Sequence, residues 1–166
     1  MIRRLLDRHN GVLPEMAVVR IWRELVGAVS LLQTGLKVAV TTSEVQNENW
    51  DLARDYFGSC LPMTRCTTAV SAISMLKDGK TTFAVVPWPE MESEQPWWTY
   101  LGPGQPDPMQ IIIALPHGRD PENATSAGGR ALVVSKSGFD DSGEDNSFLL
   151  IQCNATVSRG KLVELA

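Results

Sequence analysis

Three hydroxyl side chains in succession, Thr41, Thr42 and Ser43, follow an apolar run over residues 36–40. Hydroxyl groups at the carboxyl end of a strand can donate hydrogen bonds to a small carboxylate, because strand ends and helix N–H groups converge there in open α/β sheets. The same residues can instead form an ordinary turn in which a hydroxyl caps the next helix. Both interpretations stay open from the sequence, and the three residues are candidate ligand-binding residues.

Other reactive side chains have spacings that do not predict catalysis or metal binding. Cys60, Cys66 and Cys153 are odd in number and lack a CxxC pair, so we expect small buried hydrophobic residues. His117 follows a Leu-Pro pair without a neighbouring nucleophile pattern, and we expect a loop residue. The acidic residues within 140–145 do not match the spacing of a calcium-binding loop. The sequence therefore predicts no metal site and no cofactor.

The composition is that of a globular protein with one main domain. The chain has 166 residues, 43% of them hydrophobic, which allows a core of ordinary size. A net charge of −4 and a pI near 5.2 provide no basic surface for a nucleic-acid backbone. No apolar run approaches the roughly 18–20 residues of a membrane span, and the first residues turn polar too soon for a signal peptide. We expect a cytoplasmic protein that binds neither nucleic acid nor membrane.

An alternation of strand and helix patterns positions the hydroxyl residues. Helix patterns that end on Gly58 and Gly79 separate three strand patterns, at residues 36–41, 62–66 and 82–86. Because parallel βαβ units are right-handed, the simplest sheet has the strand order 2-1-3. Three further strands and a last helix are predicted, at residues 109–115, 131–135, 147–153 and 158–166. The expected fold class is α/β, with an N-terminal helix followed by a three-layer βαβαβ lobe that additional strands extend.

A long amphipathic helix pattern covers residues 14–33, before the first strand. Its apolar residues recur at spacings of 4-3-4-3 and form one seam, which consists of Val18, Trp22, Leu25, Val29 and Leu32. The helical stretch at residues 2–10 is too short to cover this seam. Either the α/β domain covers it, or two chains pair through it. A homodimer formed through the helix over residues 14–33 is therefore an expected partner arrangement.

An aromatic cluster lies in a proline-rich segment after the third strand. Six of the ten prolines fall between residues 87 and 108, together with Trp88, Trp97, Trp98 and Tyr100. Such rings can either fill interior space or form an exposed patch for a partner. We favour the first interpretation.

Four stretches of the chain carry a resemblance to enzymes of aromatic amino acid biosynthesis. IRRLLDRHNGVLPEMAVVRIWRELVGAVSLLQ resembles the last helices of a bacterial all-helical chorismate mutase domain, in which the third helix ends in a glutamine, here Gln33. GLKVAVTTSEVQNENWDLARDYFG and TTAVSAISMLKDGKTTFAVVPWPE are similar to the first lobe of prephenate dehydratase, a periplasmic-binding-protein-like fold. GRALVVSKSGFDDSGEDNSFLLIQCNATVSRGKLVELA resembles the return strand of that enzyme followed by the start of an ACT regulatory domain.

The resemblance implies three parts and a class of ligand. Residues 1–34 would be mutase-like helices, 35–146 a dehydratase-like α/β domain and 147–166 the start of an ACT-like segment, so we expect a truncated piece of a longer protein. Gln33 would be the catalytic residue that remains from a mutase pocket. Arg130 would bind ligand, because Arg130-Ala-Leu-Val-Val aligns with the Arg-Phe-Leu-Val part of the dehydratase motif. The implied ligand is a small carboxylate, namely chorismate, prephenate or an aromatic amino acid.

Two departures from the dehydratase pattern remove features of the enzyme. The family has GPEGTFSH where this chain has TSEVQN at residues 42–47, so the glycines that let backbone N–H groups approach an anion are missing. Gly129 stands where the family has its catalytic threonine, so the hydroxyl proposed to act as the acid is also missing. We therefore expect the α/β part to be regulatory or non-catalytic. The alternative is a non-catalytic small-ligand-binding or dimerisation module unrelated to aromatic biosynthesis.

Overall fold

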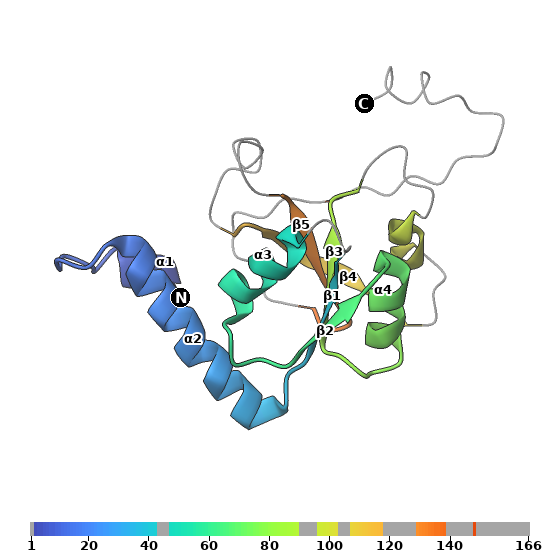
Figure 1. The fold of residues 1–166 in the computed structure, drawn as a ribbon, viewed down its shortest axis with the longest axis horizontal. Helices are drawn as coiled ribbons and strands as arrows, with labels where there is room; N and C mark the ends of the chain where they lie inside the picture. The colour runs from blue at the N-terminus through green and yellow to red at the C-terminus, as the bar shows by residue number, and fades with distance from the viewer. Residues whose placement is uncertain are drawn as a thin grey trace, which may run out of the picture.

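A five-stranded mixed sheet lies at the centre of the computed structural model, which describes residues 2–42, 47–89, 96–102, 107–117, 129–138 and 148 (Figure 1). The strands lie in the order β2-β1-β3-β5-β4. They are β1 (Val38–Thr41), β2 (Met63–Cys66), β3 (Phe83–Pro87), β4 (Gln110–Leu115) and β5 (Ala131–Ser135). The predicted α/β class and the predicted order 2-1-3 of the first three strands are confirmed.

Four α-helices and one short 3-10 helix accompany the sheet in the part of the chain that the structure describes. They are α1 (Ile2–Leu6), α2 (Glu15–Thr34), α3 (Glu48–Phe57), α4 (Ala69–Lys77) and the 3-10 helix η1 (Trp97–Leu101). None of these described helices has both the length and the apolar character needed to cross a membrane.

The first three strands run parallel, and the last two enter the sheet as an antiparallel pair. β1 pairs with both β2 and β3 in parallel, with Val38 opposite Met63 on one side and Phe83 on the other. β5 lies between β3 and β4 and is antiparallel to both, with Ala131 opposite Pro87 and Leu115. The predicted extension of the lobe by further strands is therefore confirmed for β4 and β5.

Helices cover both faces of the sheet, as Figure 1 shows for α3 and α4. On the face toward α3, Val40, Val85 and Val133 pack against Ala53 and Phe57. On the opposite face, the alternate strand residues pack against α4 and η1, and this set comprises Ala39, Ala84, Val86, Leu132, Val134, Ile73, Leu76 and Trp97. Because strand side chains alternate between faces, a continuous apolar run such as β3 can serve both cores.

Local signals mark the end of α3, where the sequence predicts it, and the start of α4. Gly58 follows α3 with φ of 85°, a backbone conformation that costs a residue with a Cβ about 1 kcal/mol or more. Thr68 caps α4, since its side-chain oxygen accepts a hydrogen bond of 3.1 Å from the backbone N–H of Ser71. The helix predicted over residues 2–10 is shorter than expected, because α1 ends at Leu6.

The long helix α2 lies at one side of the molecule, next to α3 (Figure 1). Its polar residues Arg20, Arg23 and Glu24 bind residues on or just after α3. The domain does not cover the C-terminal part of the predicted seam, since Leu25, Val29 and Leu32 are exposed, whereas Val18 and Trp22 are half-buried. Gly27 is the one buried residue of α2, and it lies against the last turn of α3. The part of the seam from Leu25 to Leu32 therefore faces away from the domain.

The aromatic cluster is partly interior. The ring of Trp97 is 2% exposed and packs in the core beside α4, which agrees with the space-filling interpretation. Trp88 and Trp98 pack against the same core, whereas Tyr100 is exposed. The strand predicted at 147–153 and the helix predicted at 158–166 lie outside the described residues, apart from Phe148.

Candidate functional site

The sheet has one edge at which several chain turns meet, which we call the carboxyl edge. The three parallel strands end there, at Thr41, Cys66 and Pro87. β5 begins there at Ala131, because it is antiparallel to β3. Residues 41–42 and 130 are therefore at the same end of the sheet, as expected of ligand-binding residues in an open α/β sheet.

Thr41 places a buried hydroxyl at this edge. The residue is 9% exposed, and its Oγ1 has no hydrogen-bond partner among the described residues. Its backbone carbonyl accepts a hydrogen bond of 3.0 Å from Nδ2 of Asn49, and the next backbone N–H, of Thr42, donates to the carbonyl of Cys66 at 2.8 Å. The main chain is thus held from both sides while the hydroxyl is left unpaired.

Thr41 does not cap the following helix, which was the alternative role for these hydroxyls. Asn47 is the N-cap residue of α3, and no side-chain hydrogen bond caps that helix. Ser43, the third candidate, lies outside the described residues, so its role stays a prediction.

Arg130 lies across β3 from Thr41. Its carbonyl accepts a hydrogen bond of 3.2 Å from the backbone N–H of Trp88, which continues the β3–β5 pairing by one step. Its guanidinium carbon lies 4.6 Å from the centre of the Trp88 ring, a cation–π contact. Its Nε is buried and has no hydrogen-bond partner in the described part of the chain. Arg130 therefore brings a positive charge and an unpaired donor to the carboxyl edge.

The two unpaired groups share one face of the sheet. Ala39, two residues before Thr41, and Leu132, two residues after Arg130, both pack in the core beside α4. Residues two apart on a strand point to the same face, so Thr41 and Arg130 belong to the α4 face as well. One strand lies between β1 and β5, which separates their backbones by about 10 Å. A small molecule, together with the reach of the Arg130 side chain, spans that distance.

The start of α4 lies on this face and carries no negative charge in its first turn. Its first N–H groups lack partners within the helix, and the helix dipole adds partial positive charge there. The start of α3, on the other face, has Glu48 and Asp51 in its first turn. A Cβ at Gly129 would overlap the carboxylate of Glu48, so this acid occupies the α3 face beside the approach to β5. An anion is therefore favoured on the α4 face and disfavoured on the α3 face.

No family model, characterised protein or solved structure matches the chain. The geometry of the described residues is therefore the basis for any functional conclusion.

Gln33 is not brought to this site. It is exposed near the end of α2, which leads into the start of β1 and so lies at the opposite end of the sheet from Thr41. Its expected catalytic role stays a prediction. In the part of the chain that the structure describes, no group of three His, Cys, Asp or Glu residues could hold a metal ion.

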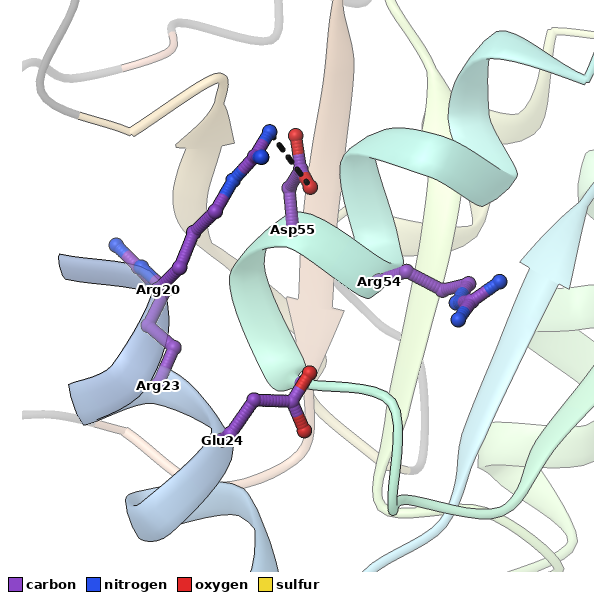
Figure 2. Close-up of a pocket in the computed structure, with 6 residues that line it drawn as sticks. Arg20, Arg23, Glu24, Arg54 and Asp55 are labelled. Atoms are coloured by element: carbon purple, nitrogen blue, oxygen red, sulfur yellow. Dashed lines mark ion pairs between the residues drawn. The ribbon is translucent and has the colours of Figure 1, made fainter. Parts of the chain in front are cut away.

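A hollow that the sequence did not indicate lies between α2 and α3 and has a volume of about 210 Å³ (Figure 2). Figure 2 shows Arg20 of α2 and Asp55 of α3 pointing toward one another, with 3.8 Å between Nη2 and Oδ1. Arg23 donates a 2.8 Å hydrogen bond to the carbonyl of Tyr56 and lies over its ring at 4.1 Å. Burial of that ring raises the pKa of Tyr56.

Glu24 completes this contact. Both of its carboxylate oxygens accept 2.9 Å hydrogen bonds from the backbone N–H of Ser59, and one also accepts a 3.0 Å bond from the Ser59 hydroxyl. The backbone hydrogen bond, followed by the hydroxyl, lowers the pKa of Glu24. Because Glu24, Arg23 and Arg20 already have partners on or after α3, we interpret the hollow as part of a structural helix–helix contact. The polar residues spaced three and four apart on α2 are the sequence signal for it.

Proposed function

We propose that the α/β domain is a non-catalytic module that binds a small carboxylate at the carboxyl edge, on the α4 face. The observation that carries the proposal is the pair of buried, unpaired donors there, the Thr41 hydroxyl and Nε of Arg130. A buried polar group without a partner destabilises a fold by about 1–3 kcal/mol. A ligand that accepts from both donors offsets that penalty. A carboxylate is such a ligand, because it only accepts hydrogen bonds and carries the charge opposite to arginine.

The surroundings support a carboxylate that carries a flat ring. The Trp88 ring, already stacked on Arg130, lies at the end of β3 and packs toward the α4-side core. Phe148 lies beside it, with 5.7 Å between ring centroids. An aromatic or cyclohexadiene ring attached to a carboxylate would meet an apolar surface next to the guanidinium.

The sheet order supports the more specific proposal of a periplasmic-binding-protein-like lobe. The chain leaves the sheet after β4 and returns in antiparallel β5, between β3 and β4, which agrees with the resemblance to the first lobe and return strand of prephenate dehydratase. On that resemblance, the first ligands to test are prephenate, chorismate and phenylalanine, and the biological setting is aromatic amino acid biosynthesis. Binding of unrelated carboxylates alone would favour a ligand-binding module outside that setting.

The non-catalytic part of the proposal depends on Gly129. This position has no hydroxyl to act as the acid in a dehydration, and the space where a side chain would begin is taken by the carboxylate of Glu48. We expect no phenylpyruvate when the chain is incubated with prephenate. Appearance of the ultraviolet absorbance of phenylpyruvate, at a rate proportional to protein concentration, would contradict a purely binding role.

Calorimetric titration of the full chain with the three ligands tests the binding proposal. Thr41→Val removes the hydroxyl and keeps the side-chain shape, so we expect affinity to fall about tenfold, or about 1.4 kcal/mol. Arg130→Met removes the charge and should abolish measurable binding. Equal affinity of the wild-type protein and Thr41→Val would refute the site, as would the absence of binding at millimolar ligand.

Thr81→Val is the matched control. Thr81 is 6% exposed, and its Oγ1 is likewise buried without a partner among the described residues, but it precedes β3 at the opposite end of the sheet. Both threonine variants remove a buried unpaired hydroxyl, so both should leave stability unchanged or raise it. Only the variant at position 41 should weaken ligand binding.

A further inference from the structure

A row of apolar side chains runs along the outward side of α2. We call it the α2 stripe, and it consists of Ile21, Leu25, Val26, Val29 and Leu32, all exposed. Ile21 is 62% exposed and Leu32 is 86% exposed, values unusual for side chains of this size on an ordered helix. In Figure 1, α2 lies at the edge of the molecule, with α3 between it and the sheet.

The contact with α3 fixes the stripe in its outward orientation. A Cβ at Gly27 would overlap the carbonyl oxygen of Phe57, so the approach of the two helices needs glycine at that point. Glu24 is bound to Ser59, and Arg23 is bound to the carbonyl of Tyr56. Arg23 and Glu24 lie on the same side of the helix as Gly27, because they precede it by four and three residues. Rotation of α2 to bury the stripe would break each of these contacts.

The size of the stripe matches what a pair of proteins requires. The exposed fractions of its five side chains together equal nearly three fully exposed ones, on the order of 500 Å² of apolar surface. Two copies would bury on the order of 1,000 Å² through these side chains alone, which is the lower bound for a specific interface. A monomer rarely leaves a continuous apolar patch of this size in water.

We propose that the α2 stripe pairs with the α2 stripe of a second copy of this chain, with the two helices antiparallel. The 4-3-4-3 spacing is that of helices that pack along a shared seam. In an antiparallel pair centred on Leu25, Val18 of one copy faces Leu32 of the other, and Ile21 faces Val29, so one surface is complementary to itself. The charged residues Arg20, Arg23 and Glu24 are on the α3 side and do not face their counterparts.

A membrane surface fits the stripe less well than a second copy. Helices that lie in a membrane interface carry lysine and arginine on their polar face and remain free to turn toward the lipid. Here Arg20 and Arg23 are engaged with α3, and the chain has a net charge of −4. An anionic lipid surface would therefore be repelled more than attracted.

Sedimentation equilibrium of the full chain at about 1–100 µM, a range that covers typical dimer affinities, tests the proposal. We expect a mass of twice 18.2 kDa for the wild-type protein. Leu25→Glu should weaken dimerisation at least 100-fold, because two carboxylates would meet at the two-fold axis. Leu25 is half exposed in the single chain, so the fold should be retained, with an unchanged far-ultraviolet circular dichroism spectrum. Ser74→Glu, which adds the same charge at an exposed position of α4, is the control and should remain dimeric.

Disulfide cross-linking tests the seam and its direction without a disruptive substitution. The chain is used with Cys60→Ser and Cys153→Ser, while buried Cys66 is kept. Leu25→Cys should form a covalent dimer on mild oxidation. A mixture of Val18→Cys and Leu32→Cys chains should cross-link with each other far more than either does with itself.

Three results would overturn the proposal. The first is a wild-type mass of 18.2 kDa throughout the concentration range. The second is a dimer that Leu25→Glu does not weaken, which would place the interface elsewhere. The third is a monomer that binds anionic phosphatidylserine vesicles in a manner abolished by Leu25→Glu, which would assign the stripe to lipid instead.

Discussion

Replacement of Gly27 by alanine tests the close contact between α2 and α3, because this contact and helix propensity predict opposite changes in stability. In the interior of an exposed helix, glycine to alanine stabilises a protein by about 1 kcal/mol. At Gly27 the added Cβ would overlap the carbonyl oxygen of Phe57, a backbone atom at the end of α3 that cannot turn aside as a side chain can. Overpacking of this kind destabilises by about 1–3 kcal/mol. The net expectation is destabilisation by about 1 kcal/mol, and more if α2 separates from α3 and loses the contacts of Arg23 and Glu24.

Thermal unfolding followed by circular dichroism measures this effect. For a chain of this length, 1 kcal/mol corresponds to a fall in Tm of about 2–4 °C. Ala28→Gly, at the next position of α2, is the matched control, and it should also lower Tm because it introduces helix-interior glycine. The protein would thus be most stable with glycine at position 27 and alanine at position 28. A rise in Tm for Gly27→Ala would refute the close contact of α2 with α3, and with it the reason why the apolar side of α2 faces outward.

Two further predictions concern the N-cap of α4 and the carboxylate of Glu24 in α2. Thr68→Ala removes the side-chain acceptor for the N–H of Ser71, so the free energy of unfolding should fall by about 1 kcal/mol, and an unchanged urea midpoint would count against the cap. Because the folded-state pKa of Glu24 lies below its ordinary value of 4.5, its ionised form stabilises the fold above that pH, and this contribution is lost as pH falls through the folded pKa. Glu24→Gln lacks the contribution, so the wild-type advantage in urea midpoint should be present at pH 7 and shrink toward pH 3. A constant difference across that range would show that the ionised carboxylate is not the stabilising group.

Signals within a few residues of each other were enough to predict most of the elements. Gly58 marks the end of α3 because only its backbone readily adopts positive φ, and Thr68 marks the start of α4 because its hydroxyl can accept a bond three residues on. The apolar run at β3 indicated a strand covered on both faces, and helices do cover both faces. The right-handed connection between parallel strands then determines the order of β1, β2 and β3.

Features that depend on residues far apart in the chain were not predictable in this way. The seam on α2 was visible in the sequence, but its outward direction depends on Gly27 meeting Phe57 and on Glu24 meeting Ser59, 35 residues away. A helical glycine in sequence indicates only a weaker helix, and no local pattern shows what it approaches. The position of β5 between β3 and β4 is likewise a pairing of distant segments.

The sequence indicated the residues of the candidate site, but it did not indicate on which face of the sheet they lie. Thr41 was found from a run of hydroxyls after a strand, and Arg130 from the resemblance to the dehydratase motif. From the sequence, we did not predict which helix start, that of α3 or that of α4, would lie near a bound anion. The acids Glu48 and Asp51, in the first turn of α3, were an available signal, because negative charge at a helix start competes with an anionic ligand.

The insertion of β5 has a consequence for how the sheet opens. Among the described strands, β4 forms backbone hydrogen bonds only with β5, so it is attached to β1, β2 and β3 through that one strand. Any fluctuation that detaches β5 from β3 releases β4 with it, whereas β4 can fray alone. Amide hydrogens of β4 should therefore exchange with solvent no more slowly than those of β5, while β1 and β3, which pair with each other and with a further strand on the other side, should be protected longest. The position of each strand in the sheet thereby determines how long its amide hydrogens are protected from exchange.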